Sequence, residues 1–117
     1  MPQSLAQLYV HIIFSTKDRR PNLSPEIQSE LWPYLAKVLE NLDCHAKAIG
    51  GVSDHVHVLC SLSKNLSVAE LVEEIKKPTS RWLKTKSETL RDFGWQNGYA
   101  AFSVSQSGLG RVRQYIA

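Results

Sequence analysis

Two histidines, His55 and His57, stand on either side of Val56 in a stretch that is predicted to be a turn followed by a strand. Because side chains alternate along a strand, both imidazoles point to the same face, about 7 Å apart. From that spacing two imidazoles can bind one cation at metal–nitrogen distances of roughly 2.1 Å. The alternative is that both are surface histidines on a solvated strand face, because such a tripeptide often arises by chance.

The elements that must position these histidines follow from hydrophobic periodicity. Strands are expected at residues 8–15, 44–49, 55–62 and 98–104, and apolar helical stripes at 27–42, 68–83 and 109–116. Ser67 and Glu70 fit the capping-box pattern that starts a helix. Pro33 predicts a kink or a restart of the first helix, and Pro78 predicts a bend in the second.

The order of these elements, strand–helix–strand–strand–helix–strand–helix, is typical of the split β-α-β arrangement, a ferredoxin-like α+β fold. We expect an antiparallel sheet with two core helices on one face and a C-terminal helix that carries a tyrosine. In this topology the first and third strands are central neighbours, so His11 should lie on the strand next to His55 and His57. A length of 117 residues fits a single domain spanning 1–117.

The composition is that of a chain that can bury a core and carries a mild positive charge. Hydrophobic residues make up 43% and charged residues 21%, and the net charge of +3 is compatible with nucleic-acid binding without requiring it. Cys44 and Cys60 form no metal or redox motif, so we interpret them as reduced, buried thiols of an intracellular protein. Residues 1–4 do not begin a signal peptide, and no apolar run approaches the roughly 20 residues that span a membrane. We therefore expect a cytoplasmic protein without a membrane partner.

Six cations gather in two segments, the loop after the first strand and the second helix. They are Lys17, Arg19 and Arg20 (the loop cluster) and Lys76, Lys77 and Arg81 (the helix cluster). Both clusters are typical of surfaces that contact the phosphates of nucleic acid. The loop cluster equally suits a solubilising loop, and the helix cluster equally suits the helix dipole, because acids precede bases along that helix.

Tyr115 lies on the predicted terminal helix, near the border of the apolar stripe formed by Leu109, Val112 and Ile116. Arg111 lies one turn earlier on the same side. A tyrosine at such a border is usually an aromatic at the rim of the core, so its position alone does not assign it a chemical role.

Five blocks of the sequence occur in an order that is found in a known family. They are Phe14–Pro21, Gly50–Val58, Ile75–Leu83, Trp95–Ser105 and Val112–Ile116. Together they resemble the single-tyrosine transposases of the HUH superfamily (histidine, hydrophobic, histidine). These include the small insertion-sequence transposases of the IS-two-hundred type and the REP-associated tyrosine transposases. The resemblance covers essentially the whole chain.

The resemblance implies a DNA transposase that cleaves and rejoins single-stranded DNA near hairpins, leaving a 5′-phosphotyrosine and a free 3′-hydroxyl. It implies that Tyr115 is the nucleophile and that His55 and His57 bind a divalent metal ion, Mg²⁺ or Mn²⁺, although two imidazoles also suit Zn²⁺. The third ligand in the family is a glutamine one helical turn beyond the tyrosine, a position past Ala117. Family members are commonly homodimers in which the tyrosine helix of one subunit serves the histidines of the other. DNA contacts are expected at the loop cluster, the helix cluster and Arg111.

Two other functions remain open. One is a catalytically impaired module of the same fold that binds single-stranded DNA or a hairpin. The other is an RNA-recognition domain, which needs aromatic residues exposed on its central strands, and here only Tyr9 and Tyr99 qualify. These two tyrosines, expected on strands, and Tyr34, expected in the core, are weaker candidates for the nucleophile than Tyr115, because a terminal helix can move with the loss of few contacts.

Overall fold

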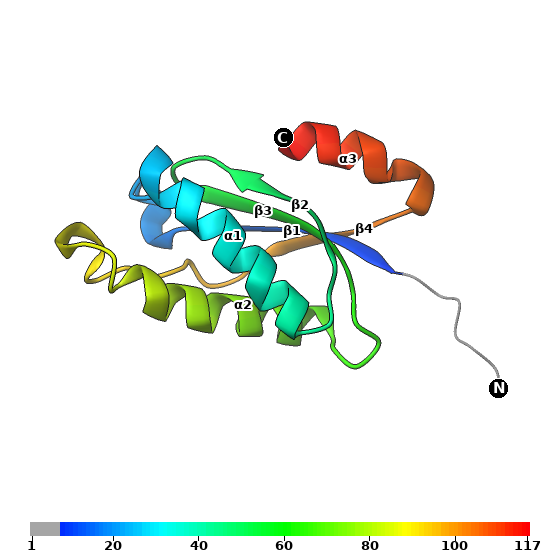
Figure 1. Ribbon diagram of the computed structural model, residues 1–117, viewed down its shortest axis with the longest axis horizontal. Coiled ribbons are helices and arrows are strands. Elements are labelled where there is room, and N and C mark those ends of the chain that lie inside the picture. Colours follow the sequence, from blue (N-terminus) through cyan, green and yellow to red (C-terminus); the bar gives the residue numbers. More distant parts are fainter. Residues whose placement is uncertain (1–7) are drawn as a thin grey trace.

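The computed structural model describes residues 8–117 as one sheet with helices on both sides (Figure 1). The strands are β1 (Tyr9–Ser15), β2 (Ala46–Gly51), β3 (His55–Ser61) and β4 (Ala100–Val104), and the helices are α1 (Pro25–Asn41), α2 (Val68–Leu83) and α3 (Leu109–Ile116). Three short 3₁₀ turns are η1 (Lys17–Arg19), η2 (Glu88–Leu90) and η3 (Gln106–Gly108). The expectation for residues 1–4 lies outside the described residues. Within 8–117, no helix is long and apolar enough to cross a membrane.

The four strands pair in the order β2-β3-β1-β4, and every pairing is antiparallel. This order makes β1 and β3 the central neighbours and confirms the ferredoxin-like α+β fold expected from the sequence. The register sets Ile13 opposite His57 and His11 opposite Leu59, so His11 and His57 are diagonal neighbours on one face. The sheet therefore brings histidines from two strands together, as the sequence predicts.

One face of the sheet forms the main core with α1 and α2 (Figure 1), and we call it the helix face. Its strand residues are at most 6% exposed: Val10, Ile12, Phe14, Val56, Val58 and Cys60. The helices supply buried leucines and Ile75 from their apolar stripes. The opposite face, which we call the histidine face, carries His11, Ile13, His55, His57 and Leu59. α3 packs on this face over β2 and β3.

Both long helices begin where their capping residues predict. The Ser24 hydroxyl accepts a backbone N–H of the first turn of α1, and Ser67 with Glu70 forms the capping box of α2. Each helix then continues without a break through its internal proline, Pro33 in α1 and Pro78 in α2. The predicted restart of α1 is therefore wrong, because burial of its apolar stripe outweighs the loss of one backbone hydrogen bond.

The second strand is shifted relative to its predicted range of 44–49. Gly50 and Gly51 belong to β2 and not to the turn, which is closed by a hydrogen bond from the Val52 N–H to the His55 carbonyl oxygen at 3.0 Å. A Cβ on Gly51 would lie 2.1 Å from that same oxygen, so only glycine fits there. The tight turn fixes His55 as the first residue of β3.

Candidate active site

His11 and His57 make direct contact on the histidine face. His11 is 8% exposed, and its Nε2 lies 3.0 Å from Nδ1 of His57, which is a hydrogen bond between two imidazoles. The ring centroids are 5.2 Å apart and the planes are inclined by 29°. The strands β1 and β3, predicted to be neighbours, thus place His11 in direct contact with His57.

Gly50 determines how closely α3 approaches this face. It lies opposite His57 in the β2–β3 ladder, and a Cβ there would be 2.8 Å from the carbonyl oxygen of Ile116 and 3.0 Å from its side chain. Ile116 is buried at this point. The lack of a side chain at Gly50 lets the last turn of α3 rest on the sheet, and this brings Tyr115 over the histidines.

Tyr115 extends from α3 over two imidazoles of its own chain. Its ring centroid is 5.7 Å from that of His57 and 6.2 Å from that of His11, and both pairs are edge-to-face. Tyr115 is nevertheless 70% exposed. One side of the ring therefore rests on the histidines while the rest faces solvent, and Arg111, one turn earlier, is also exposed.

Asp54 holds the other predicted ligand, His55. Its Oδ1 accepts a hydrogen bond from Nδ1 of His55 at 3.0 Å, and its Oδ2 lies 3.5 Å from Nε of Arg19. The hydrogen bond from His55, and then the charges of His55 and Arg19, lower the pKa of the Asp54 carboxyl. Asp54 is therefore ionised at neutral pH and can only accept hydrogen bonds.

The loop cluster lies beside this aspartate in a strained conformation. Asp18 and Arg19 have φ angles of 56° and 54°, a left-handed region that non-glycine residues rarely occupy. The Asp18 N–H donates to Oε1 of Gln96 at 2.9 Å, and the Thr16 N–H donates to the Asp54 carbonyl oxygen at 3.0 Å. These bonds hold the loop against the turn before β3, so the loop cluster lies at the His55 end of the histidine face.

Burial changes the protonation of two of the histidines. Desolvation lowers the pKa of His11, and the neighbouring His57 lowers it further. Desolvation likewise lowers the pKa of His57, with His55 as the second cause. Both imidazoles are therefore neutral at pH 7, the form in which one ring nitrogen offers a lone pair to a metal ion or a hydrogen-bond donor.

The nitrogen atoms of the site fit a divalent cation as a two-donor set. Among the described residues, no group of three or more histidines, cysteines or carboxylates is placed to hold a metal ion. In His55 and His57 the Nδ1 atom is engaged, by Asp54 and by His11, whereas neither Nε2 makes a hydrogen bond within residues 8–117. Metal-binding histidines in general show this arrangement. A cation on the two Nε2 atoms would take its remaining ligands from elsewhere.

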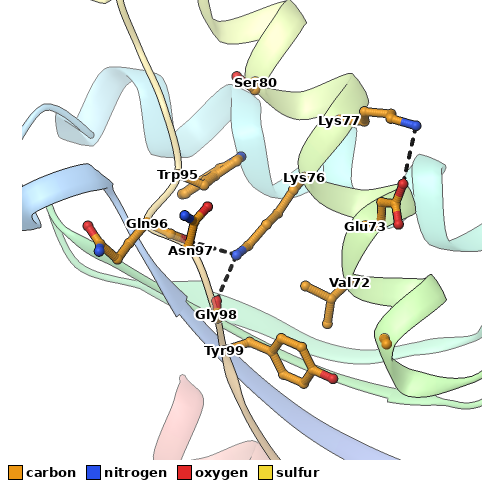
Figure 2. A pocket seen from close by; sticks show the side chains of 11 residues that line it. Val72, Glu73, Lys76, Lys77, Ser80, Trp95, Gln96, Asn97, Gly98 and Tyr99 are labelled. Carbon is orange, nitrogen blue, oxygen red and sulfur yellow. Dashed lines mark hydrogen bonds and ion pairs between the residues drawn. The ribbon is translucent and has the colours of Figure 1, made fainter.

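The side chain of Lys76, the first residue of the helix cluster, is hydrogen-bonded to other residues of the chain (Figure 2). Its ammonium donates to the carbonyl oxygens of Gln96 at 2.8 Å and Gly98 at 2.7 Å, and burial lowers its pKa. These bonds anchor the segment 95–99 beside α2, and helix and segment together line a groove of about 410 Å³. Lys76 therefore differs from the other predicted DNA contacts, because its charge is already paired with backbone carbonyls.

Lys77 and Arg81 are the exposed cations of the helix cluster. Lys77 forms an ion pair with Glu73 at 3.3 Å at the rim of the groove, and Arg81 makes no ion pair within the described residues. The segment 97–99 lines both this groove and a smaller cavity of about 230 Å³ beside His55. A continuous surface therefore leads from α2 across this segment to the start of β3.

Comparison with known proteins identifies the family of the chain. Residues 4–117 match the family model described as "Transposase IS200 like". The chain belongs to this family of transposases. Its family function is accordingly DNA transposition, and the resemblance seen in five blocks of the sequence is confirmed.

Three relatives extend the comparison of this IS200-like transposase. ISDra2 transposase TnpA of Deinococcus radiodurans is 24% identical over 115 residues, which cover 94% of this chain and 82% of the relative. A candidate transposase from Deinococcus radiodurans R1, solved by crystallography, superposes with a TM-score of 0.78 at 22% identity and covers 99% of this chain and 95% of that one. The REP-associated tyrosine transposase bound to a REP hairpin has a TM-score of 0.69 at 16% identity, with 99% of this chain and 68% of that one covered. The two solved structures confirm the fold.

The remaining tyrosines occupy different surroundings from Tyr115. Tyr9 is buried, and Tyr34 stacks on Trp82 with ring centroids 4.6 Å apart while staying partly exposed, so its predicted place in the core is wrong. Tyr99 precedes β4 and is not in a strand, because the segment before it is held to α2 by Lys76.

Asp54 and Gly50 are residues of the site for which the sequence predicted no part in the chemistry. The signal for both was that they belong to the same sequence block, Gly50–Val58, as the two histidines. Neither contact could be read without the register and the side-chain conformations.

Proposed function

We propose that this transposase cleaves and rejoins single-stranded DNA as one domain spanning 1–117. In this proposal Tyr115 is the nucleophile, and His55 and His57 bind a divalent cation, Mg²⁺ or Mn²⁺. One observation carries the proposal: an exposed tyrosine on a short terminal helix has its ring centroid 5.7 Å from that of one of the two histidines. An aromatic with only a packing role would be expected to bury its ring.

The reaction is a displacement at phosphorus. The phenolic oxygen of Tyr115 attacks the phosphate, the bond from phosphorus to the 3′ oxygen breaks, and the products are a 5′-phosphotyrosine and a free 3′-hydroxyl. The phenol gives up its proton and the 3′ oxygen gains one. A second 3′-hydroxyl then attacks the phosphotyrosine and releases the tyrosine. The covalent intermediate keeps the energy of the bond, so rejoining needs no other energy source.

The residues of this chain divide the remaining tasks. A bound divalent cation supplies Lewis-acid neutralisation of the phosphate charge. The edge-to-face contacts of the Tyr115 ring with His11 and His57 hold the tyrosine beside the proposed metal ligands, and its exposed side leaves the phenolic proton free to pass to water. The exposed guanidinium of Arg111, one turn before Tyr115, is available to bind a phosphate oxygen.

The proposed partner is single-stranded DNA that carries a hairpin. Among the cations predicted to contact DNA, those that face solvent are the loop cluster, Lys77 at the rim of the α2 groove, Arg81 further along α2, and Arg111 on α3. The REP-associated tyrosine transposase, which shares this fold, is bound to a REP hairpin. Lys76 would contribute by holding the segment 95–99. Because phosphate contacts release counterions, the affinity should fall steeply with salt.

We also propose a homodimer. β4 is an edge strand, and its residues Ala100 to Ser103 are exposed. Phe102 is 56% exposed on this edge and lies against His11, with ring centroids 6.3 Å apart. An edge that pairs with no further strand of residues 8–117 and carries an exposed aromatic is a natural surface for a second copy. Light scattering should show a dimer, and a monomer at all concentrations would contradict this proposal.

Covalent labelling tests the function directly. The protein is incubated with a fluorescent hairpin oligonucleotide and Mg²⁺ or Mn²⁺, and the expected product is a protein–DNA adduct that survives denaturation. The double variant His55→Ala, His57→Ala should lose both the adduct and Mn²⁺ binding by calorimetry. His45→Ala is the matched control, because His45 is an exposed histidine away from the site. Unchanged Mn²⁺ affinity in the double variant would contradict the metal assignment.

A second candidate is a binding module that has lost cleavage. The observation in its favour is that the described residues hold no set of three metal ligands. Hairpin binding that depends on Lys77 and Arg81, without any adduct in the wild type under either metal, would favour this function over the first.

A further inference from the structure

The two histidines proposed as metal ligands are engaged through the same ring nitrogen. Nδ1 of His55 lies 3.0 Å from Oδ1 of Asp54, and Nδ1 of His57 lies 3.0 Å from Nε2 of His11. The partners come from different places, since Asp54 belongs to the turn before β3 and His11 belongs to β1. Two contacts from different parts of the chain therefore leave the same atom, Nε2, available on both histidines.

Asp54 determines the tautomer of His55. An ionised carboxylate only accepts hydrogen bonds, so Nδ1 of His55 must carry the hydrogen. In the neutral ring, Nε2 then has the lone pair. Oδ2 of Asp54 in turn lies 3.5 Å from Nε of Arg19, which keeps the carboxylate pointing at the histidine.

His11 offers the matching contact to His57. Of the two possible assignments of this hydrogen bond, only one leaves the Nε2 lone pair of His57 available, and in it Nδ1 of His57 donates to Nε2 of His11. His11 is almost completely buried and packs against Phe102 and Tyr115, so its ring has little room to turn. A fixed acceptor of this kind holds both the tautomer and the orientation of the ring it contacts.

We infer that Asp54 and His11 are positioning residues that present the Nε2 lone pairs of His55 and His57 to one cation, and that Arg19 ties the loop cluster to this arrangement through Asp54. The inference rests on the proposed function for the identity of the ligands. It adds two residues from outside the histidine motif, and it gives Arg19 a role at the site besides any contact with DNA.

The tautomers can be measured without metal. Long-range ¹H–¹⁵N correlation spectra of the full chain at about pH 8, above the ordinary imidazole pKa of about 6.5, separate the two neutral forms. We expect the Nδ1–H form for His55 and His57, whereas the exposed His45 should mix both forms and serves as the internal reference. In Asp54→Ala the His55 signal, and in His11→Phe the His57 signal, should move toward that mixture. An Nε2–H form of either histidine in the wild type would overturn the inference.

Mn²⁺ calorimetry on the metal-free protein provides the second measurement. Asp54→Ala and His11→Phe should each weaken Mn²⁺ binding by about 10–100-fold. Asp54→Asn should lose less, because its amide oxygen can still accept the Nδ1 hydrogen, and His45→Phe should bind like the wild type. If His11→Phe does not fold, His11→Gln, which retains an acceptor oxygen, takes its place and should keep the wild-type tautomer of His57.

The outcomes separate the inference from the proposed function. Mn²⁺ affinity that stays at the wild-type value in Asp54→Ala and His11→Phe, or in Asp54→Ala alone where His11→Phe does not fold, overturns the inference and leaves the function standing. No Mn²⁺ binding by the wild type contradicts the proposed metal site, and the tautomer spectra then decide the inference alone.

Discussion

Neighbouring residues of β1 and β3 point to opposite faces of the sheet, and the two faces are built from different side chains. The helix face presents aliphatic residues, one phenylalanine and a thiol that are at most 6% exposed under α1 and α2. The histidine face presents His11, His55 and His57, and within residues 8–117 the short helix α3 packs on this side over β2 and β3. A shift of one residue along either strand changes the environment from packed core to polar site.

The comparison shows how a small domain separates stability from chemistry. The helix face buries enough apolar surface to order both central strands, so their opposite sides are held rigidly as well. On such a support, imidazoles can stay at fixed distances even though α3 buries few residues. Substitutions on the helix face should therefore change stability, and substitutions on the histidine face should change activity.

Replacing Tyr115 with phenylalanine should produce the largest effect, and only on activity. The change removes one oxygen from an exposed ring, so the free energy of unfolding should stay within about 0.5 kcal/mol of the wild type. Adduct formation should fall by at least about 10³-fold, because no other group replaces the nucleophile. Tyr99→Phe is the matched control, since Tyr99 is another exposed tyrosine, and it should label normally. An adduct that persists in Tyr115→Phe would show that another residue is the nucleophile.

Two adjacent isoleucines of β1 test whether the helix face contributes more to stability than the histidine face. Ile12 is buried on the helix face, whereas Ile13 is partly buried on the histidine face. Ile12→Ala should cost about 2–5 kcal/mol, because it leaves a cavity in the main core. Ile13→Ala should cost only about 1 kcal/mol. Urea unfolding of both variants measures the difference, and equal losses would mean that the two faces are equally packed.

Much of this arrangement could be predicted from the sequence, because it depends on periodicity. Alternation along β1 and β3 assigned each residue to its face, and the apolar stripe gave α3 its observed bounds of Leu109–Ile116. The contacts of the site could not be predicted in the same way. The hydrogen bond between His57 and His11 depends on the diagonal register and on both side-chain conformations.

The segment 95–99 also escaped prediction, because it has no periodicity of its own. Tertiary hydrogen bonds place it: the indole N–H of Trp95 donates to Oγ1 of Thr79 at 3.1 Å, and Lys76 donates to two carbonyl oxygens. Lys76, which the sequence predicts as a DNA contact, thus also anchors this segment of the fold. Charge alone does not distinguish these two uses.

Gly50→Ala should loosen the packing of α3 on the histidine face, at a smaller cost in stability than Ile12→Ala. The new methyl group would lie 2.8 Å from the carbonyl oxygen of Ile116, so α3 must move away from β2. We expect a loss of about 1–3 kcal/mol, confined mainly to α3, with faster hydrogen exchange there and less adduct.

Gly110→Ala provides the control for this variant. Gly110 lies in the same helix, and a Cβ there meets nothing within 4 Å. Its substitution should strengthen α3 by up to about 1 kcal/mol, because alanine favours the helix. If Gly50→Ala leaves exchange in α3 and adduct formation unchanged, the close approach at Gly50 does not position Tyr115.

The smallest expected effect is an alkaline one, and it belongs to the helix face alone. Burial, and then the neighbouring Cys44, raises the pKa of the Cys60 thiol from 9.0 to about 12. Below pH 9 the thiol is protonated in both the folded and the unfolded chain, so its contribution to stability is fully present. Between pH 9 and 12 the unfolded chain releases this proton and the folded chain keeps it, so stability falls as the pH rises.

From pH 8 to pH 10 the loss of stability from the Cys60 thiol should be about 1.4 kcal/mol. Urea unfolding at both values should show this loss in the wild type and in Ile13→Ala, whose substitution lies on the histidine face. In Cys60→Ala the loss should be smaller, with a part remaining from Cys44, because burial raises the pKa of that thiol as well. If Cys60→Ala loses as much stability as the wild type, the alkaline loss comes from other groups and the thiol does not report on the burial of the helix face.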